Sequence, residues 1–469
     1  MSRKKILFYV HVSSHLKASL KFIQLLQINV NYEPVVFLNS GGGWNLTKDL
    51  NFCTQNGIRY ILDSESERFF ASMPELSTVP PAAPYFSPEQ KAQSYGAKDC
   101  IKNFLKRKFS MLVFWNYCRK RIKEFKVLLE LNQIYVVILP EDSYENQALM
   151  VRAAKDLKRP SILIPWAKAN HEDVIQLQHT SITWKSNLFC KLFPRWKMKW
   201  QGAEITPIGL SKIIVMELLH IAPYQPFSRF GGSSDVMLVE NDDDFYFYTV
   251  SGLQQGKMIK TGAIFQDIFF NILNHEKELK KQLCDKYKII DQRPIVLCNL
   301  FPVATQVDKP YIGYEYESVR EAISFWLDPL LESEKFQVWV NHHPRTTIEY
   351  VKYLEDLDLK VIYEPIEDIL PFCDLYVTGV SSTTRMALAL AKPMVCLTEF
   401  YVYTDLDNFR SVCKADSKTK YLRFIKEIDQ DDDYFNQLKY QAINDAKHFG
   451  PIDGRSYHRI LRVLDSLTN

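Results

Sequence analysis

The first half of the chain alternates short apolar runs with longer segments of helical periodicity. The runs that predict strands are residues 5–10, 35–38, 134–139, 161–164 and 236–239. Between the first two runs, apolar side chains recur from Leu16 to Leu26 at the spacing of one helix face. Uninterrupted Val, Ile and Leu runs are typical of parallel strands that are buried on both faces. The pattern therefore predicts strands and helices alternating around a parallel sheet.

The second half repeats this alternation more regularly. Strands are predicted at residues 294–300, 336–340, 360–363, 375–377 and 393–397. Helices are predicted at residues 317–331, 347–357, 366–372 and 383–390. Such an order of elements predicts a doubly wound parallel sheet. Residues 264–287 join the two halves, and their pattern predicts one long amphipathic helix.

The length of the chain supports two domains. At 469 residues it exceeds the size at which a single hydrophobic core usually splits. We place the boundary near residues 261–263, which gives an N-terminal domain of residues 1–262 and a C-terminal domain of residues 263–469. Both domains are expected to be α/β.

The composition is that of a folded protein with no strong overall charge. Apolar residues make up 46% of the chain and charged residues 24%, which excludes a disordered chain, a collagen and a coiled coil. The 58 basic and 55 acidic side chains leave a net charge of +3, so we expect no nucleic-acid partner. No apolar run is long enough for a signal peptide or a spanning helix, and the nine cysteines contain no CxxC pair. These features indicate a cytoplasmic protein with reduced thiols.

Polar residues follow three consecutive strands of the second half. His343, Pro344 and Arg345 come shortly after the strand at 336–340, and Glu364 follows the strand at 360–363. The strand at 375–377 is followed by a hydroxyl cluster, which consists of Ser381, Ser382, Thr383 and Thr384. Because open parallel sheets bind ligands at the carboxyl ends of their strands, all of these residues are expected on one rim.

The hydroxyl cluster opens a predicted helix. Free backbone N–H groups and the helix dipole favour an anion there, which predicts a phosphate site without a metal. The alternative is that Ser382 only caps the helix. His343 is expected to be held in an extended conformation by Pro344, which aims its ring into the crevice, and Arg345 adds a fixed cation nearby. The alternative is that His343 makes only a structural hydrogen bond.

These motifs resemble the donor half of GT-B glycosyltransferases that build bacterial surface polysaccharides. The shared pattern is HHP after one strand, EP after the next, and CDLYVTGVSST followed by ALAKPMVCL. It is most similar to bacterial sialyltransferases and polysialyltransferases, Kdo and other capsule transferases, and CDP-glycerol glycerophosphotransferases. The resemblance implies two Rossmann-like domains facing a central cleft. It also implies that His343, Pro344, Ser381, Ser382 and Thr383 hold the CMP part of a nucleotide-sugar donor.

The resemblance further implies an acidic motif in the first domain that supplies the catalytic base. Glu141 and Asp142 occupy this position after the strand at 134–139, and Ser143 stands where the related motif has Gly. A carboxylate there can take the proton from an acceptor hydroxyl as that hydroxyl attacks the anomeric carbon. Adjacent side chains of an extended chain point to opposite sides, so one carboxylate is expected to act, Asp142 being the first candidate and Glu141 the second. The alternative is a solvated turn.

Three further motifs depart from the pattern or have a structural explanation. Arg385 begins the segment where related enzymes often carry a ribose-binding Glu, which argues against a UDP donor and leaves ribose binding to Glu364 or another residue. The acidic run 242–244 resembles a metal-binding DxD motif but is expected in a turn or at a helix start, so we expect no metal. Residues 450–459 resemble the ending of capsule transferases, or form only a turn and a closing helix.

Two stretches combine basic and aromatic residues. Residues 102–126 contain nine Lys or Arg and one Glu, and residues 184–200 contain five Lys or Arg, three Trp and no acid. Such segments suit an anionic membrane surface or a lipid-linked, phosphorylated acceptor. The alternative is a solvated face over a packed aromatic core.

The sequence thus predicts a metal-independent GT-B glycosyltransferase that is cytoplasmic or attached to the inner face of the membrane. The expected donor is a CMP-activated 2-keto acid sugar of the sialic, pseudaminic, legionaminic or Kdo type, and the expected acceptor is a growing surface glycan. One set of alternatives is enzymatic: a CDP-glycerol or CDP-ribitol phosphotransferase, or a UDP-sugar transferase or epimerase. The other alternative is a non-catalytic, glycan-binding subunit of a polysaccharide assembly complex.

Overall fold

The computed structural model divides the chain into two compact units. The residues that the structure describes are 3–11, 13–39, 46–63, 97–143, 145–165, 180–181, 184–300, 316, 318–342, 353–355, 357, 359–379, 381–398 and 405–468. The first unit contains residues 1–239, 244–260 and 461–469, and the second contains residues 240–243 and 261–460. The last nine residues therefore belong to the first unit, whereas the predicted C-terminal domain of residues 263–469 includes them.

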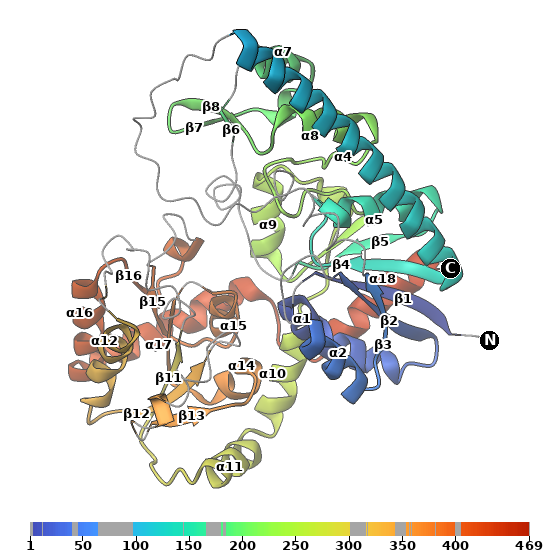
Figure 1. The fold of residues 1–469 in the computed structure, drawn as a ribbon. Coiled ribbons are helices and arrows are strands. Elements are labelled where there is room, and N and C mark those ends of the chain that lie inside the picture. Colours follow the sequence, from blue (N-terminus) through green and yellow to red (C-terminus); the bar gives the residue numbers. More distant parts are fainter. Residues whose placement is uncertain are drawn as a thin grey trace. The chain divides into compact units, whose positions relative to one another are not determined.

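The first unit is built on a parallel sheet of seven strands. The strands are β1 (Lys4–Val10), β2 (Tyr32–Asn39), β3 (Arg59–Asp63), β4 (Ile134–Leu139), β5 (Ser161–Leu163), β9 (Val236–Val239) and β10 (Met258–Lys260). They lie in the order β10-β9-β5-β4-β1-β2-β3, and every pairing is parallel (Figure 1). The five strands that the apolar runs predicted are all present, which confirms this part of the sequence analysis.

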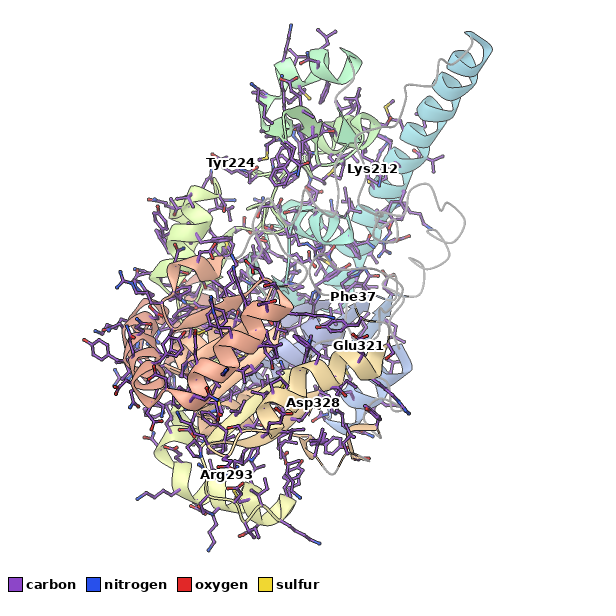
Figure 2. The ribbon with its side chains drawn as sticks, turned by 90° about the vertical axis from the view of Figure 1, so that its left-hand side faces the viewer. Phe37, Lys212, Tyr224, Arg293, Glu321 and Asp328 are labelled. Atoms are coloured by element: carbon purple, nitrogen blue, oxygen red, sulfur yellow. The ribbon has the colours of Figure 1, made fainter. Side chains whose placement is uncertain are left out.

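Helices pack on this sheet and extend beyond it. They are α1 (Ser13–Gln27), α2 (Leu46–Gln55), α4 (Ala97–Leu131), α5 (Glu145–Asp156), α7 (Trp184–Leu192) and α8 (Leu210–Leu218), together with the C-terminal parts of α9 (Asp242–Val250) and α18 (Ser456–Thr468), which both begin in the second unit. The long helix α4 packs on the sheet through Phe125, whose ring centroid lies 5.8 Å from that of Phe37 in β2 (Figure 2). Farther along, Lys212 of α8 lies over Phe114 of α4 with its Nζ 5.8 Å from the ring centroid (Figure 2).

A small antiparallel sheet lies in the same part of the first unit as α7. Its strands are β6 (Thr180–Ser181), β7 (Met198–Trp200) and β8 (Ala203–Thr206), in the order β6-β8-β7. No predicted strand corresponds to them, because strands of two to four residues are too short to show an alternating pattern. Figure 1 shows α4 running from the large sheet past α8 towards α7.

The second unit is built on a parallel sheet of six strands. They are β11 (Ile295–Leu300), β12 (Gln337–His342), β13 (Lys360–Ile362), β14 (Leu375–Gly379), β15 (Met394–Leu397) and β16 (Val412–Ala415). Their order is β13-β12-β11-β14-β15-β16, again with every pairing parallel. The predicted doubly wound sheet is therefore confirmed, with β16 as an additional edge strand.

Along the chain, the helices of the second unit come before, between and after these strands. They are α10 (Ile264–Asn274), α11 (Glu276–Tyr287), α12 (Val319–Leu331), α14 (Ile366–Ile369), α15 (Thr383–Ala389), α16 (Lys418–Gln430) and α17 (Asp432–Ala446). Glu321 and Asp328 mark α12 in Figure 2. Lys418 of α16 forms an ion pair with Glu321 at 3.6 Å. The helix predicted at residues 347–357 falls largely outside the described residues, of which 353–355 are helical.

The prediction of one helix over residues 264–287 is wrong, because α10 ends at Asn274 and α11 begins at Glu276. His275 between them has φ −124° and ψ 23°, outside the helical region, and its Nδ1 lies 2.9 Å from the carbonyl oxygen of Asn271. Asn and His favour helices weakly, whereas Glu276 and Glu278 favour a helix start through the dipole. The local sequence therefore ends one helix and begins another without disturbing the amphipathic pattern.

The end of the chain completes the first unit. The hydroxyl of Tyr32 donates to Asp465 of α18 at 2.5 Å, and the ammonium of Lys4 donates to the carbonyl oxygen of Thr468 at 2.9 Å. Within the part of the chain that the structure describes, no helix has the length and apolar character needed to cross a bilayer.

Candidate functional site

The two sheets reverse their winding at corresponding positions in their strand orders. In each unit the first strand in the sequence lies between the second and the fourth, so the order runs outwards in both directions from the pairs β1/β4 and β11/β14. In open parallel sheets, the crevice at this reversal, beside the carboxyl ends of the strands, is where ligands bind. The residues that follow these four strands are therefore the candidate site residues of each unit.

In the first unit, Asp142 follows β4 and is completely buried. Its Oδ2 accepts a hydrogen bond from the backbone N–H of Ser234 at 2.7 Å, and its own N–H donates to the carbonyl oxygen of Arg229 at 3.3 Å. Burial raises the pKa of this carboxyl, although the Ser234 bonds and the charge of Lys257 act in the opposite direction. Asp142 thus ties the end of β4 to the loop at 228–234.

Ser143 strengthens the same connection. Its hydroxyl accepts from the backbone N–H of Gly231 at 2.6 Å and also contacts the carbonyl oxygen of Ser228 closely. A Cβ atom on Gly231 would lie 2.5 Å from the Ser143 Oγ, so these two residues fit only because position 231 is glycine. The Ser that replaces the Gly of the related motif is accommodated by a glycine 88 positions later.

Glu141, unlike Asp142, reaches the surface. Its side chain is 19% exposed, and its two carboxylate oxygens lie 3.7 Å from Nε2 of His15 and 3.8 Å from Nη1 of Arg229. Burial, together with the neighbouring His11 and Arg229, lowers the pKa of His15 to about 3. The imidazole is therefore neutral at neutral pH, and Arg229 is the cation beside Glu141.

Three residues near Glu141 were not predicted from the sequence, namely His11, His15 and Arg229. His11 follows β1 directly, and β1 pairs with β4, so the position of His11 at the end of the first strand was an available signal. Arg229 is brought to Glu141 by backbone bonds of a loop that lies far away in the sequence, and no local pattern marks it.

In the second unit, a chain of hydrogen bonds leads across the sheet to Ser381. The side-chain amide of Asn299, in β11, donates to the phenol oxygen of Tyr376 in β14 at 3.0 Å. The Tyr376 hydroxyl lies 2.7 Å from Oγ1 of Thr383, which donates to Oγ of Ser381 at 3.1 Å. Tyr376 is fully buried, and burial raises its pKa far above the ordinary value, so it remains a neutral phenol.

The amide of Asn299 sets the direction of the first bond in this chain. Because the NH₂ group of Asn299 can only donate, Tyr376 is free to donate to Thr383, and Thr383 donates to Ser381. Among the described residues, none accepts the proton of the Ser381 hydroxyl, which is partly exposed. Ser381 therefore presents a hydrogen-bond donor at the carboxyl end of β14.

The neighbouring hydroxyls hold the turn that begins α15. Thr384 Oγ1 donates to the carbonyl oxygen of Ser381 at 2.7 Å, and the backbone N–H of Thr383 donates to Ser381 Oγ at 3.3 Å. Ser382 is the residue before the helix, and its side chain makes no capping bond. Helix capping by Ser382, the simple structural explanation of this cluster, does not describe its geometry.

The end of β12 is described as far as His342. Asn341 donates to the carbonyl oxygens of Ile362 and Glu364 at 2.8 and 3.1 Å, which joins the ends of β12 and β13. The three residues that follow, His343, Pro344 and Arg345, lie outside the described residues.

Glu364 is held by α11. Its Oε1 accepts from Lys286 Nζ at 2.5 Å, and its Oε2 accepts from the hydroxyl of Tyr287 at 2.6 Å. Partial burial opposes the charged form, but the two bonds outweigh it and lower the pKa of Glu364. With both oxygens engaged, Glu364 anchors the end of β13 to α11.

Three motifs from the sequence analysis have structural roles. Arg385, which stands where related enzymes often have Glu, forms an ion pair with Glu240 at 2.7 Å. The acidic run begins α9 at Asp242, as expected for a helix start. Asp453 accepts from the guanidinium of Arg459 at 2.9 and 3.0 Å beside the turn at Gly454, and α18 follows.

Comparison with known proteins supports the fold. No protein-family model and no curated protein matches the sequence. The chain is similar to the UDP-GlcNAc 2-epimerase from Neisseria meningitidis bound to UDP-GlcNAc, with a TM-score of 0.52 and 13% identity over 99% of this chain and 100% of that chain. It is similar to MnaA from S. aureus in complex with UDP, with a TM-score of 0.51 and 12% identity over 98% and 96% of the two chains.

A third similar structure is a polymerase. The wall teichoic acid polymerase TagF has a TM-score of 0.51 and 9% identity over 99% of this chain and 88% of that chain. At such low identity these likenesses establish the fold. Together with the two parallel sheets and their common strand order, they show that this chain has the GT-B fold.

Proposed function

We propose that the protein is a nucleotide-sugar-dependent glycosyltransferase that extends a bacterial surface glycan. The observation that carries the proposal is the chemistry at the two sheet reversals. The second unit presents the hydroxyl donor of Ser381 after β14, and the first unit presents the carboxylate of Glu141 after β4. A donor for phosphate oxygens and an acceptor for a hydroxyl proton are the two groups that sugar transfer requires.

The second unit is proposed to bind the donor. Ser381 donates to the phosphate, the backbone around Ser382, Thr383 and Thr384 lines the same place, and His343, Pro344 and Arg345 contribute from the end of β12. The departing charge is stabilised by these donors without a metal. A CMP-activated 2-keto acid sugar suits such a site, because its leaving group carries a single phosphate. Glu364, which is engaged by α11, is not proposed as the ribose ligand.

The first unit is proposed to supply the base, and Glu141 suits this role better than Asp142. Glu141 is partly exposed, while Asp142 has no exposed surface and is bonded to the backbone of Ser234. In the reaction, the acceptor hydroxyl attacks the anomeric carbon and gives its proton to Glu141, and the bond from that carbon to the phosphate oxygen breaks. Asp142 then acts as a positioning residue for the loop that carries Arg229.

A second candidate is an enzyme that uses a UDP-sugar, either a transferase or a 2-epimerase. It is favoured by the fold likeness to the structures that contain UDP and UDP-GlcNAc. The ion pair between Arg385 and Glu240 argues against it, since Arg385 occupies the position where the resemblance leads us to expect a ribose-binding Glu. The teichoic acid polymerase likeness keeps a CDP-linked glycerol or ribitol donor as a further alternative.

Calorimetric titration with CMP, CDP, UDP and GDP tests the donor assignment. We expect CMP to bind and Ser381→Ala to weaken its binding by about tenfold or more, because a hydrogen bond to a charged group contributes about 1.5–3 kcal/mol. Ser466→Ala is the matched control, since Ser466 bonds within α18 at the carbonyl oxygen of Val463. Binding of UDP alone would replace CMP by UDP as the donor nucleotide. CMP binding that is equal in Ser381→Ala and the control would refute the site.

A second measurement tests the base. With donor and acceptor supplied, Glu141→Gln is expected to lower kcat, and Asp142→Asn is expected to lower thermal stability with a smaller effect on kcat. Retention of full turnover by Glu141→Gln together with its loss in Asp142→Asn would reverse the two roles.

A further inference from the structure

Helix α7 carries two exposed leucines on one face. Leu188 is 64% exposed and Leu192, one turn later, is 76% exposed. The opposite face is already packed, because Cys190 is buried and the stacked rings of Phe189 and Phe193 lie against the core of the first unit. The leucines are therefore not part of that core, and they form a separate apolar surface.

Basic side chains accompany the two leucines. Lys191 is exposed on α7 between them, and Lys199 is exposed on β7. Neither has a carboxylate at ion-pair distance in the described part of the chain, whereas Arg195 and Lys197 pair with Glu217 and Glu204. Lys197, the residue before β7, also reaches Asn187 of α7 at 3.5 Å, so β7 begins close to this helix. We call Leu188, Lys191, Leu192 and Lys199 the α7 surface.

The aromatic residues of the same stretch have a different place. Trp196 is completely buried, and its Nε1–H donates to Glu217 at 2.5 Å. Trp200 is partly buried and packs with Ile205 and Phe227. The rings of Trp196 and Trp200 thus support the fold, as a packed core beneath a solvated face requires. Leucine and lysine are among the exposed side chains of the described residues in this stretch.

We infer that the α7 surface docks on an anionic lipid bilayer. Exposed leucines enter the boundary between headgroups and acyl chains, and neighbouring lysines are attracted to anionic headgroups. The absence of any acidic residue between positions 184 and 200 gives this stretch the charge that matches such a membrane. The inference does not depend on the reaction proposed above, because it rests on a surface that contains none of the candidate site residues.

Vesicle flotation of the full chain tests the inference. The probes are vesicles of phosphatidylcholine alone and of phosphatidylcholine with 30% phosphatidylglycerol. We expect binding to the anionic vesicles and a loss of binding when salt is raised. The double variant Leu188→Gln/Leu192→Gln is expected to bind about tenfold more weakly or worse, because two exposed apolar side chains no longer enter the lipid.

Matched controls separate this surface from other exposed apolar residues. Ile28→Gln/Leu131→Gln changes two side chains of the first unit that are 81% and 77% exposed, and it is expected to leave vesicle binding unchanged. For charge, Lys191→Glu is expected to weaken binding to anionic vesicles, whereas Lys281→Glu on the exposed side of α11 is not. All four variants alter exposed positions, and circular dichroism verifies that they fold.

Three outcomes would overturn the inference. The wild type fails to bind anionic vesicles, the leucine variant binds as tightly as the wild type, or the Ile28/Leu131 control loses binding equally. A change of oligomeric state in the leucine variant without a change of vesicle binding would assign the surface to a second copy of the chain instead.

Discussion

Gly231 offers the sharpest test of how the first unit positions its site. Replacing it with Ala places a Cβ atom 2.5 Å from Ser143 Oγ, 2.6 Å from Pro223 Cβ and 3.0 Å from the carbonyl oxygen of Gln225. Two of these neighbours are a proline ring and a backbone oxygen, which cannot rotate away. We therefore expect the loop to move away from Ser143 and to carry Arg229 with it.

The cost follows from two effects. Overpacking of a tight site costs about 1–3 kcal/mol. Displacing the loop also breaks the 2.6 Å bond from the Gly231 N–H to Ser143 Oγ, which contributes about 0.5–1.5 kcal/mol. Gly231→Ala is thus expected to destabilise the first unit by about 2–4 kcal/mol. For a domain of this size, that corresponds to a fall in Tm of roughly 4–10 °C.

Scanning calorimetry measures this difference, with Gly256→Ala as the control. A Cβ on Gly256 meets no atom within 4 Å, so that variant is expected to melt like the wild type. The double variant Ser143→Gly/Gly231→Ala is expected to lose less stability than the sum of the two single variants, since the hydroxyl that meets the new Cβ is gone. If Gly231→Ala melts within 1 °C of Gly256→Ala, position 231 is not closely packed against Ser143 and Pro223.

Three further predictions concern other residues. Glu141→Gln is expected to lower kcat by about 10²–10⁴ with unchanged donor Kd, as measured by single-turnover kinetics and titration; unchanged kcat would exclude it as the base. The pKa of His15 is about 3 in the folded protein and 6.5 in the unfolded chain. The unfolded state therefore binds one more proton than the folded state as the pH falls below 6.5. Wild-type stability should then fall by about 1 kcal/mol per pH unit between pH 6 and pH 3, and the slope should flatten in His15→Gln; equal slopes in urea unfolding would contradict this. Gly454→Ala, at φ 68° with a Cβ 2.6 Å from a carbon of Phe270, is expected to lower the Tm of the second unit by several degrees in scanning calorimetry, and an unchanged Tm would argue against the turn.

Much of the fold was accessible from the sequence because its strands are apolar runs between polar segments. Runs such as 134–139 and 375–377 have one explanation when they recur at regular spacing, namely buried parallel strands. The break at His275 was not accessible. Both helices keep an amphipathic pattern. The position of the break depends on whether Asn274 or His275, which both favour helices weakly, leaves the helical conformation.

The candidate site was predicted only where it follows strand ends. Ser381 and Glu141 are predicted by that rule, but the difference in exposure between Glu141 and Asp142 depends on the loop at 228–234, whose backbone bonds to Asp142. Tyr376 appeared as one more apolar residue of a buried strand. Its role depends on the pairing of β11 with β14, which brings Asn299 to its hydroxyl, and this pairing is a property of the folded sheet.

The hydrogen-bond chain from Asn299 to Ser381 bears on the charge of any ligand that the proposed donor site would accept. With the Tyr376 hydroxyl donating to Thr383, every proton along the chain points towards Ser381, so a phosphate oxygen would find a donor there, while an ammonium group would find its place already taken by a proton. The direction is set at the far end by one amide. An Asp at position 299 would accept the Tyr376 proton, and each hydroxyl would then turn inwards. A single atom exchange, made two side chains away from Ser381, would thus change the charge that the Ser381 hydroxyl favours from negative to positive.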